Sequence, residues 1–210
     1  MAGPAREAVV LVHGLWLAGW VMIPLARRLR ACGLEPYRFS YPSVAAGLSE
    51  NAAALRRFAG TVPQEVVHFV GHSLGGIVVL AMLADGTWTR AGRVVTLSSP
   101  HRGSRAAASL ARWSWGRRML GRSIADLQRR PPPAPGGFAV GLVQGTRPIG
   151  LGRLIAPLAA PHDGVVSVAE MELPGAAAHV RLRVSHLGML LSRAVAAETC
   201  AFLRTGRFRA

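Results

Sequence analysis

The stretch EVVHFVGHSLGGIVVLAMLA, residues 65–84, decides the fold. It begins with β-branched and aromatic residues up to Gly71 and ends in a long apolar run of helix formers, which predicts a strand, a tight turn and a helix. Gly71 and Gly75 stand where side chains would collide with the strand and the helix. The hydroxyl of Ser73 would project clear of the backbone, at the positive end of the helix, as a nucleophile attacking a carbonyl requires. The alternative is a Gly/Ser loop that only connects a strand to a helix.

The composition is that of one globular domain. The chain has 210 residues, half of them hydrophobic, which is enough for a full core. All 25 basic residues are arginine and the net charge is +15, which raises the question of a nucleic-acid or membrane partner. The arginines are spread along most of the chain and no known nucleic-acid-binding motif is present, so we expect no nucleic-acid partner. No stretch resembles a secretory signal, and we expect a cytoplasmic location.

The two cysteines, Cys32 and Cys200, both fall in helical patterns. We interpret them as small core residues. A disulfide between them is the less favoured alternative in a chain without a recognisable signal.

Strands alternate with helices along the chain. Strands are expected at 8–12, 35–41, 65–70, 93–98, 138–144 and 179–185, and helices at 19–32, 47–59, 74–84 and 188–204. The strands are apolar runs without alternation, which indicates a parallel sheet covered on both faces. Ser49 is the expected N-cap of the second helix. In the last helix, Leu190, Leu191, Val195 and Phe202 are expected to point inward.

The GHSLGG segment, residues 71–76, resembles the nucleophile elbow of the α/β-hydrolase family, and in particular its bacterial lipase and esterase branch. Further segments resemble the same family in the same order: HG at 13–14, SPHRGS at 99–104, DGVV at 163–166 and SH at 185–186. The resemblance implies an α/β three-layer sandwich around a mostly parallel sheet of about six strands. It also implies a single domain over residues 1–210 with a cap-like insertion at about 101–137. The chain is short for this family, which favours small or medium-sized esters.

The resemblance assigns the acid of a Ser-His-Asp triad to Asp163. The DGVV segment looks like the one in which lipases place this acid, and it follows the strand next after the fourth. Glu170 and Glu172 are close rivals in sequence, and an ordinary Asp-Gly turn is the alternative interpretation of the motif.

The family order Ser…Asp…His requires a histidine after Asp163, and only His179 and His186 qualify. His179 begins the last expected strand, at its wrong end. His186 follows the carboxyl end of that strand, beside the Ser73 turn, because ligands gather at the carboxyl edge of parallel strands. We therefore expect Ser73, Asp163 and His186 to be the catalytic residues.

The family's oxyanion loop is similar to the segment that follows residues 8–12. The resemblance implies that the backbone N–H groups of Leu15 and Leu74 form the oxyanion hole, each worth about 3–4 kcal/mol of barrier. Trp16 and His72 are expected to line the substrate site, and His72 also to support the turn. His13 is expected to have a supporting role rather than a chemical one.

Residues 104–130 hold Trp113, Trp115, Met119, Leu120 and many arginines. We expect a mobile amphipathic cap with its apolar side toward an acyl chain and its basic side toward water or anionic lipid. A fixed surface helix is the alternative. Membrane contact through residues 104–130 is left open but is not favoured.

Together these features predict a serine hydrolase that cleaves carboxylic esters through an acyl-enzyme intermediate. The expected partner is a small-molecule ester with an apolar acyl chain. No cofactor is required, and no residues have metal-ligand spacing, so we expect no metal site. A thioesterase or acyltransferase on the same fold is one alternative. A non-catalytic ligand-binding protein is another, since fold does not determine function.

Overall fold

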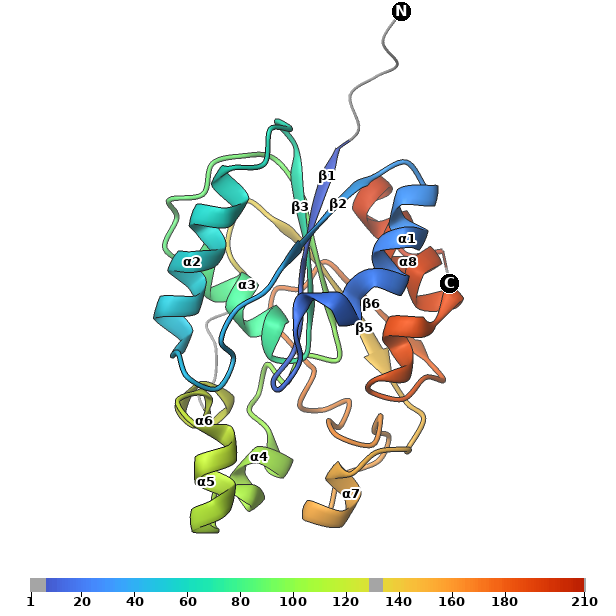
Figure 1. Ribbon diagram of the computed structural model, residues 1–210. Helices are drawn as coiled ribbons and strands as arrows, with labels where there is room; N and C mark the ends of the chain where they lie inside the picture. Colours follow the sequence, from blue (N-terminus) through green and yellow to red (C-terminus); the bar gives the residue numbers. More distant parts are fainter. Residues whose placement is uncertain (1–6, 129–133, 210) are drawn as a thin grey trace, which may run out of the picture.

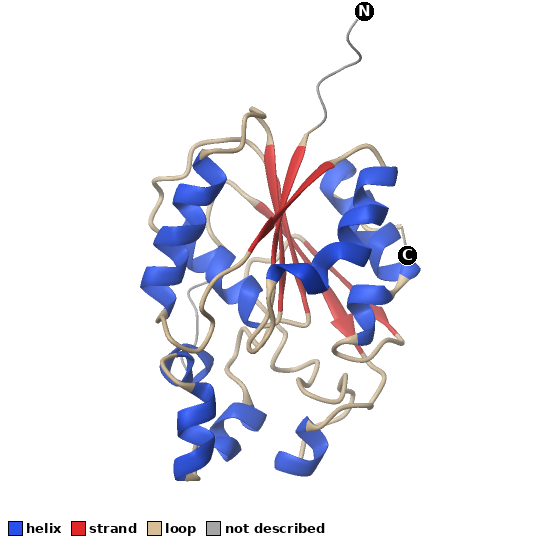
Figure 2. Ribbon diagram, viewed as in Figure 1, coloured by secondary structure: helices blue, strands red, loops and turns tan. Residues whose placement is uncertain are grey.

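The computed structural model describes residues 7–128 and 134–209, and a six-stranded sheet forms their centre (Figures 1 and 2). The strands lie in the order β2-β1-β3-β4-β5-β6, and all neighbours are parallel. The expected parallel sheet of about six strands is therefore confirmed. The strands are β1 (Ala8–Val12), β2 (Glu35–Phe39), β3 (Val67–His72), β4 (Arg93–Leu97), β5 (Ala139–Gly145) and β6 (Ala178–Leu182).

Helices cover both faces of the sheet. On one face lie α2 (Leu48–Gly60) and α3 (Leu74–Ala84), and on the other lie α1 (Ile23–Ala31) and α8 (Arg193–Thr205) (Figure 1). β1 and β3 are buried along their whole length because each contacts both layers. This explains why these strands are continuous apolar runs in the sequence.

The helix α3 is the most apolar helix and lies against the centre of the sheet. Nine of its 11 residues are buried. An apolar helix of this length is a core element. In the described ranges, 7–128 and 134–209, no helix combines the length and apolar character needed to cross a bilayer.

The carboxyl end of the sheet carries the remaining elements. The short helices α4 (Arg105–Leu110), α5 (Ser114–Leu120), α6 (Ser123–Gln128) and α7 (Gly152–Ile155) lie beyond this end, at the bottom of Figure 1. Two 3-10 turns, η1 (Gly19–Met22) and η2 (Gly188–Leu191), precede α1 and α8. Part of the expected cap, residues 129–133, lies outside the described residues.

Three local predictions are wrong. The N-cap of α2 is Gly47, whose N–H donates to the carboxylate of Glu50 at 2.9 Å, so Ser49 lies inside the first turn. Leu191 is 62% exposed because η2 ends there and the chain changes direction before α8 begins. The expected helix over 188–204 is therefore two elements rather than one.

The third error concerns the cysteines. Cys32, directly after α1, and Cys200, in α8, form a disulfide with their Cα atoms 6.6 Å apart. They are 168 residues apart in sequence, and only the packing of α1 against α8 brings them together. Helical periodicity identifies an inward face but does not say which helix that face meets.

Removing the disulfide should destabilise the protein. The bond closes a loop of 168 residues, and cross-links of this kind typically contribute about 2–4 kcal/mol by restricting the unfolded chain. We expect Cys200→Ser to lower the free energy of unfolding by this amount in urea titrations. The double variant Cys32→Ser/Cys200→Ser should match the single variant under oxidising conditions. If the wild type has the same stability with and without a reducing agent, the pairing is wrong.

Candidate functional site

Ser73 lies at the turn between β3 and α3, in strained backbone geometry. Its φ is 54° and its ψ is −123°, a region that residues other than glycine rarely adopt. Close packing holds the turn in place: a Cβ at Gly71 would lie 2.4 Å from Gly76, and one at Gly75 would lie 2.4 Å from the carbonyl oxygen of Val12. The glycines are therefore required by contact with the neighbouring backbone.

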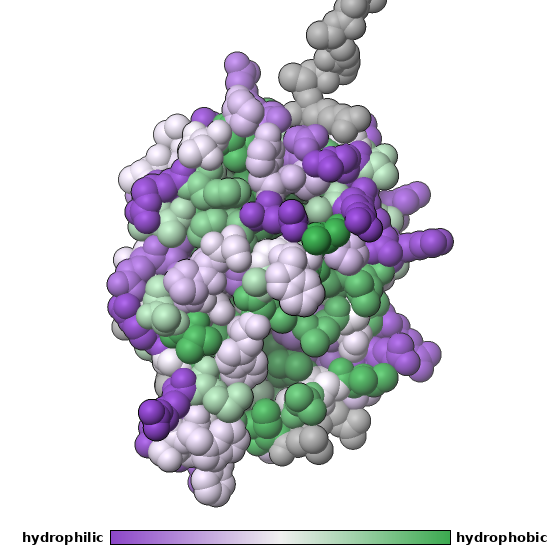
Figure 3. Space-filling model, viewed as in Figure 1, coloured by the Kyte–Doolittle hydropathy of each residue, from purple (hydrophilic) through white to green (hydrophobic). Residues whose placement is uncertain are grey.

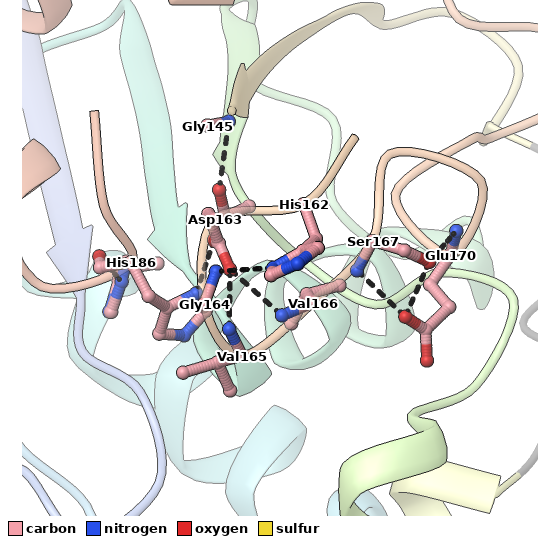
Figure 4. Close-up of polar contacts among 11 residues, drawn as sticks. Gly145, His162, Asp163, Gly164, Val165, Val166, Ser167, Glu170 and His186 are labelled. Carbon is pink, nitrogen blue, oxygen red and sulfur yellow. Dashed lines mark hydrogen bonds and ion pairs between the residues drawn. The ribbon is translucent and has the colours of Figure 1, made fainter. Parts of the chain in front are cut away.

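Asp163 and His186 are in direct contact (Figure 4). His186 follows β6, and its Nδ1 lies 2.6 Å from Oδ2 of Asp163. The other carboxylate oxygen of Asp163 accepts from the N–H groups of Val165 and Val166 at 2.9 and 2.8 Å. The N–H of His186 donates to the carbonyl oxygen of Asp163 at 3.0 Å. Both the carboxylate and its backbone are thus tied to the segment that carries the imidazole.

The contacts of Asp163 decide its charge state. Its side chain is fully buried, which alone would raise its pKa. The neighbouring His186 and the two backbone N–H groups outweigh burial and hold the pKa of Asp163 below its ordinary value. The carboxylate is therefore ionised at neutral pH and can keep the Nδ1–H tautomer of His186 in place.

The rival residues have other partners. The carboxylate of Glu170 accepts from the N–H of Ser167 at 2.7 Å (Figure 4). It also accepts from the N–H of Arg105 at 2.6 Å. Glu172 forms an exposed ion pair with Arg102 at 3.1 Å. His179 lies exposed within β6. In the described part of the chain, no three His, Cys, Asp or Glu side chains are grouped to hold a metal ion.

His72 connects the Ser73 turn to the segment of His186. Its Nε2–H donates to the carbonyl oxygen of His186 at 2.9 Å, and the two rings are 4.8 Å apart. Burial, helped by the charge of His186, lowers the pKa of His72 to about 3, so its ring is neutral. Ser73 and His186 line the same cavity, although no hydrogen bond joins their side chains in the described structure. Such contacts commonly tighten only when substrate binds.

The segment after β1 forms the other wall of the site. His13 is buried, stacks on Tyr41 at 4.4 Å and accepts the N–H of Tyr41 at 3.2 Å through Nε2, which is the expected supporting role. Among the described residues, neither the N–H of Leu15 nor that of Leu74 donates to another protein group. Leu74 is the first residue of α3, whose opening amides have no partner within the helix.

Trp16 lines the mouth of the cavity and joins it to the cap. Its backbone N–H donates to Oγ of Ser43 at 3.2 Å, and its Nε1–H donates to the carbonyl oxygen of Met119 at 2.8 Å. Ser43 in turn accepts the hydroxyl of Ser123 through its carbonyl oxygen. Sequence reasoning missed Ser43, because nothing in the local pattern shows that residues 43, 16 and 123 meet.

Gly145 and Ser98 were also missed. A Cβ at Gly145 would lie 2.8 Å from the Cβ of Asp163, so only glycine leaves room for the acid there. Oγ of Ser98 accepts the N–H of Gly145 at 3.2 Å, and Ser98 has a φ of 47°. The sequence does show a glycine, Gly145, at the end of an expected strand. It does not show which side chain packs against that glycine.

The cavity beside Ser73 has a volume of about 460 Å³ and an apolar lining. Leu110, Leu120 and Leu127 of the cap segment line it, and Ile149, Ile155 and Leu187 face them. No Arg, Asp or Glu side chain among the described residues contributes to this lining. The site therefore suits a neutral, apolar group next to the serine hydroxyl.

The expectation for the apolar residues of the cap is only partly right. Leu120 is buried and lines the cavity. Trp113, Trp115 and Met119 are 62%, 54% and 47% exposed and are not part of its lining. The packing of Gly116 explains the exposure of the large side chains of α5. A Cβ at Gly116 would lie 2.0 Å from the carbonyl oxygen of Leu110, so the inner side of the helix has no room for a large residue there, and the large side chains occupy the outer side.

The family comparison and the structural comparison lead to the same group of proteins. The model of the alpha/beta hydrolase family matches residues 9–198. No curated protein sequence matches significantly. The mature lipase BlEst2 of Bacillus licheniformis is similar in structure, with a TM-score of 0.75, 19% identity and coverage of 99% of this chain and 95% of that one. The metagenomic carboxyl esterase MGS0156 has a TM-score of 0.69 at 19% identity, with coverage of 89% of this chain and 66% of that one.

A lipase-esterase related protein from Clostridium acetobutylicum is also similar, with a TM-score of 0.65, 11% identity and coverage of 94% of this chain and 93% of that one. At these identities the likeness shows the fold alone. The chemistry of this chain has to be argued from its own residues.

Two buried neutral histidines should make stability fall in mild acid. Burial lowers the pKa of His101 to about 4, and that of His72 is about 3, against an ordinary value of 6.5. Below about pH 6.5 these histidines bind protons in the unfolded chain but not in the folded protein. Their full contribution to the free energy of unfolding is therefore present above about pH 6.5 and is lost as the pH falls toward 4. The loss is at most about 1.4 kcal/mol per pH unit for each histidine. We expect His101→Gln to flatten the decline between about pH 6 and pH 4.5 in urea titrations.

His179→Gln is the matched control, because His179 is exposed. Its pH profile should follow that of the wild type. An equally steep decline in His101→Gln would show that His101 is not held neutral.

Proposed function

The chain belongs to the alpha/beta hydrolase family, and from this premise we propose that it is a serine hydrolase that cleaves carboxylic esters. The observation that carries the proposal is the contact of 2.6 Å between His186 Nδ1 and Asp163 Oδ2, at the edge of the cavity that Ser73 lines. The contact directs Nε2 of His186 to act as the proton acceptor. The proposed roles are nucleophile for Ser73, general base for His186 and orienting acid for Asp163.

In the proposed reaction, Oγ of Ser73 attacks the ester carbonyl carbon and its proton passes to Nε2 of His186. Collapse of the tetrahedral intermediate breaks the bond to the alcohol oxygen, which takes that proton and leaves. Water then attacks the acyl-enzyme and gives a proton to His186. The bond between the acyl carbon and Oγ of Ser73 breaks, Oγ takes the proton back from His186, and the acid leaves. Asp163, ionised and buried, stabilises the imidazolium that forms twice in the cycle.

The N–H groups of Leu15 and Leu74 are the proposed oxyanion donors. Two features support this: their lack of protein acceptors among the described residues, and the position of Leu74 at the first turn of α3. The contact of Trp16 with Met119 ties the segment after β1, which carries Leu15, to the cap, and its contact with Ser43 ties the same segment to the loop after β2. Preorganised donors of this kind need no rearrangement when charge develops on the substrate oxygen.

The proposed substrate is a neutral ester with an apolar acyl chain. The support is the lining of the cavity, to which the described residues contribute leucine side chains from the cap segment and no charged side chain. An acyl chain buried there would leave water, at about 0.8 kcal/mol per methylene group.

Ser73→Ala should abolish ester hydrolysis. Without Oγ no acyl-enzyme can form, and we expect the rate with p-nitrophenyl butyrate to fall by at least about 10⁴-fold. Ser49→Ala, an exposed serine in α2, should retain the wild-type rate and serves as the control. If Ser73→Ala is folded and as active as the wild type, a non-catalytic binding role replaces this proposal.

Narrowing the cavity should change the preferred acyl length. Leu110 lies in α4 and lines the cavity beside Leu127. We expect Leu110→Phe to reduce kcat/KM for p-nitrophenyl laurate by at least about tenfold relative to the butyrate, because an added ring fills space that the longer chain needs. Leu191→Phe, at an exposed position, is the control. Equal effects on both esters would place the acyl chain elsewhere.

A further inference from the structure

The exposed apolar side chains of the described residues are concentrated at one end of the molecule. Ten large hydrophobic side chains are exposed, and eight of them lie on α5 or its N-cap, on residues 149–155 or at the cavity mouth. We call these eight the mouth face: Trp16, Trp113, Trp115, Met119, Ile149, Leu151, Ile155 and Leu187. Figure 3 shows apolar side chains gathered in the lower part of the molecule, where Figure 1 places α7. Such a patch usually marks a contact surface.

The segment that carries most of the mouth face is rich in positive charge. In the sequence, residues 101–162 contain ten arginines, of which Arg129 and Arg130 lie outside the described residues, and a single acid, Asp126, which is buried. Arg112, Arg117 and Arg118 are exposed beside the tryptophans of the cap. The exposed acids nearest to the cap segment, Glu50 and Glu172, are already paired with Arg122 and Arg102.

The other exposed or half-buried acids lie toward the opposite end of the sheet. Glu7, Glu35 and Glu65 stand just before or at the start of β1, β2 and β3, and Asp85 follows the end of α3. The acids near the end where the cavity opens are therefore either buried or paired with arginine, and the remaining exposed acids lie toward the other end.

We propose that the mouth face docks on an anionic phospholipid surface, so that the cavity opens toward lipid. Tryptophan rings with one polar edge suit the headgroup region of a bilayer, and arginines attract anionic headgroups. The combination favours lipid over nucleic acid, because nucleic acid would leave the isoleucine and leucine side chains exposed to water. Docking itself does not require the proposed function, since no step of it uses Ser73; only the entry of an ester from the lipid into the cavity rests on that function.

The test uses the full-length Ser73→Ala protein, which removes hydrolysis from the measurement. The protein is sedimented with phosphatidylcholine vesicles, with or without 30% phosphatidylglycerol (roughly physiological anionic content). We expect at least tenfold stronger binding to the anionic vesicles, and a decrease as salt is raised. Equal binding to both vesicle types, or none to either, overturns the proposal.

Two double variants locate the surface. Trp113→Ser/Trp115→Ser and Arg117→Gln/Arg118→Gln should each weaken vesicle binding at least tenfold. The matched controls are Trp20→Ser, which is 68% exposed but lies in η1, and Arg27→Gln/Arg57→Gln, whose exposed arginines lie on α1 and α2. The controls should bind within twofold of the parent protein. If the controls lose as much as the cap variants, the attraction is a property of total charge and the mouth face is not the docking site.

Two further readouts separate the alternatives. Sedimentation velocity without lipid should show a monomer; a dimer that is lost in Trp113→Ser/Trp115→Ser would mean that a second copy covers the face. Retention on DNA stronger than on anionic vesicles would also overturn the proposal. The tryptophan variant with Ser73 intact should still hydrolyse soluble p-nitrophenyl butyrate, so a failure of docking and a failure of the proposed function give different results.

Discussion

The contact of α3 with the end of β1, made through glycine, is the constraint on which the candidate site depends. A Cβ at Gly75 would lie 2.4 Å from the carbonyl oxygen of Val12 and 2.5 Å from that of His13. This closeness brings the first turn of α3 against the segment that carries Leu15 and leaves Ser73 with a positive φ. The strain at one residue is therefore maintained by packing that spans two strands and a helix.

From this turn outward, the site is tied together by backbone contacts as much as by side chains. Nε2–H of His72 donates to the carbonyl oxygen of His186, and the backbone N–H of His186 donates to the carbonyl oxygen of Asp163. Both links join segments that lie side by side at the carboxyl end of the sheet but are far apart in the chain. The same arrangement explains why Asp163 stays ionised although it is buried: its partners, including two backbone N–H groups, are fixed before any substrate arrives.

The cap is bonded to the site rather than free of it. The ring of Trp16 and the hydroxyl of Ser123 connect the cap with the loops after β1 and β2. Its inner side supplies the leucine lining of the cavity, whereas its outer side presents tryptophan and arginine to solvent. The disulfide stabilises the layer formed by α1 and α8, on one face of the sheet. It joins the end of α1 to α8, the helix that follows the His186 segment. The elements around the candidate site are thus supported from both layers of helices.

The sequence by itself determined the order and type of the main elements, because apolar runs, glycines and helix formers act locally. The prediction of a helix over 74–84 agrees with α3 residue for residue. The sequence also indicated the candidate residues Ser73, Asp163 and His186, through the strand-turn-helix pattern around Ser73 and through the resemblance of the DGVV and SH segments to the family, with His186 favoured because strand ends in a parallel sheet meet at one edge. Only the tertiary structure decided the pairing of Cys32 with Cys200, the link through Ser43, and the exposure of Trp113 and Trp115. Each of these depends on which surfaces meet across long sequence separations, and local periodicity carries no information about that choice.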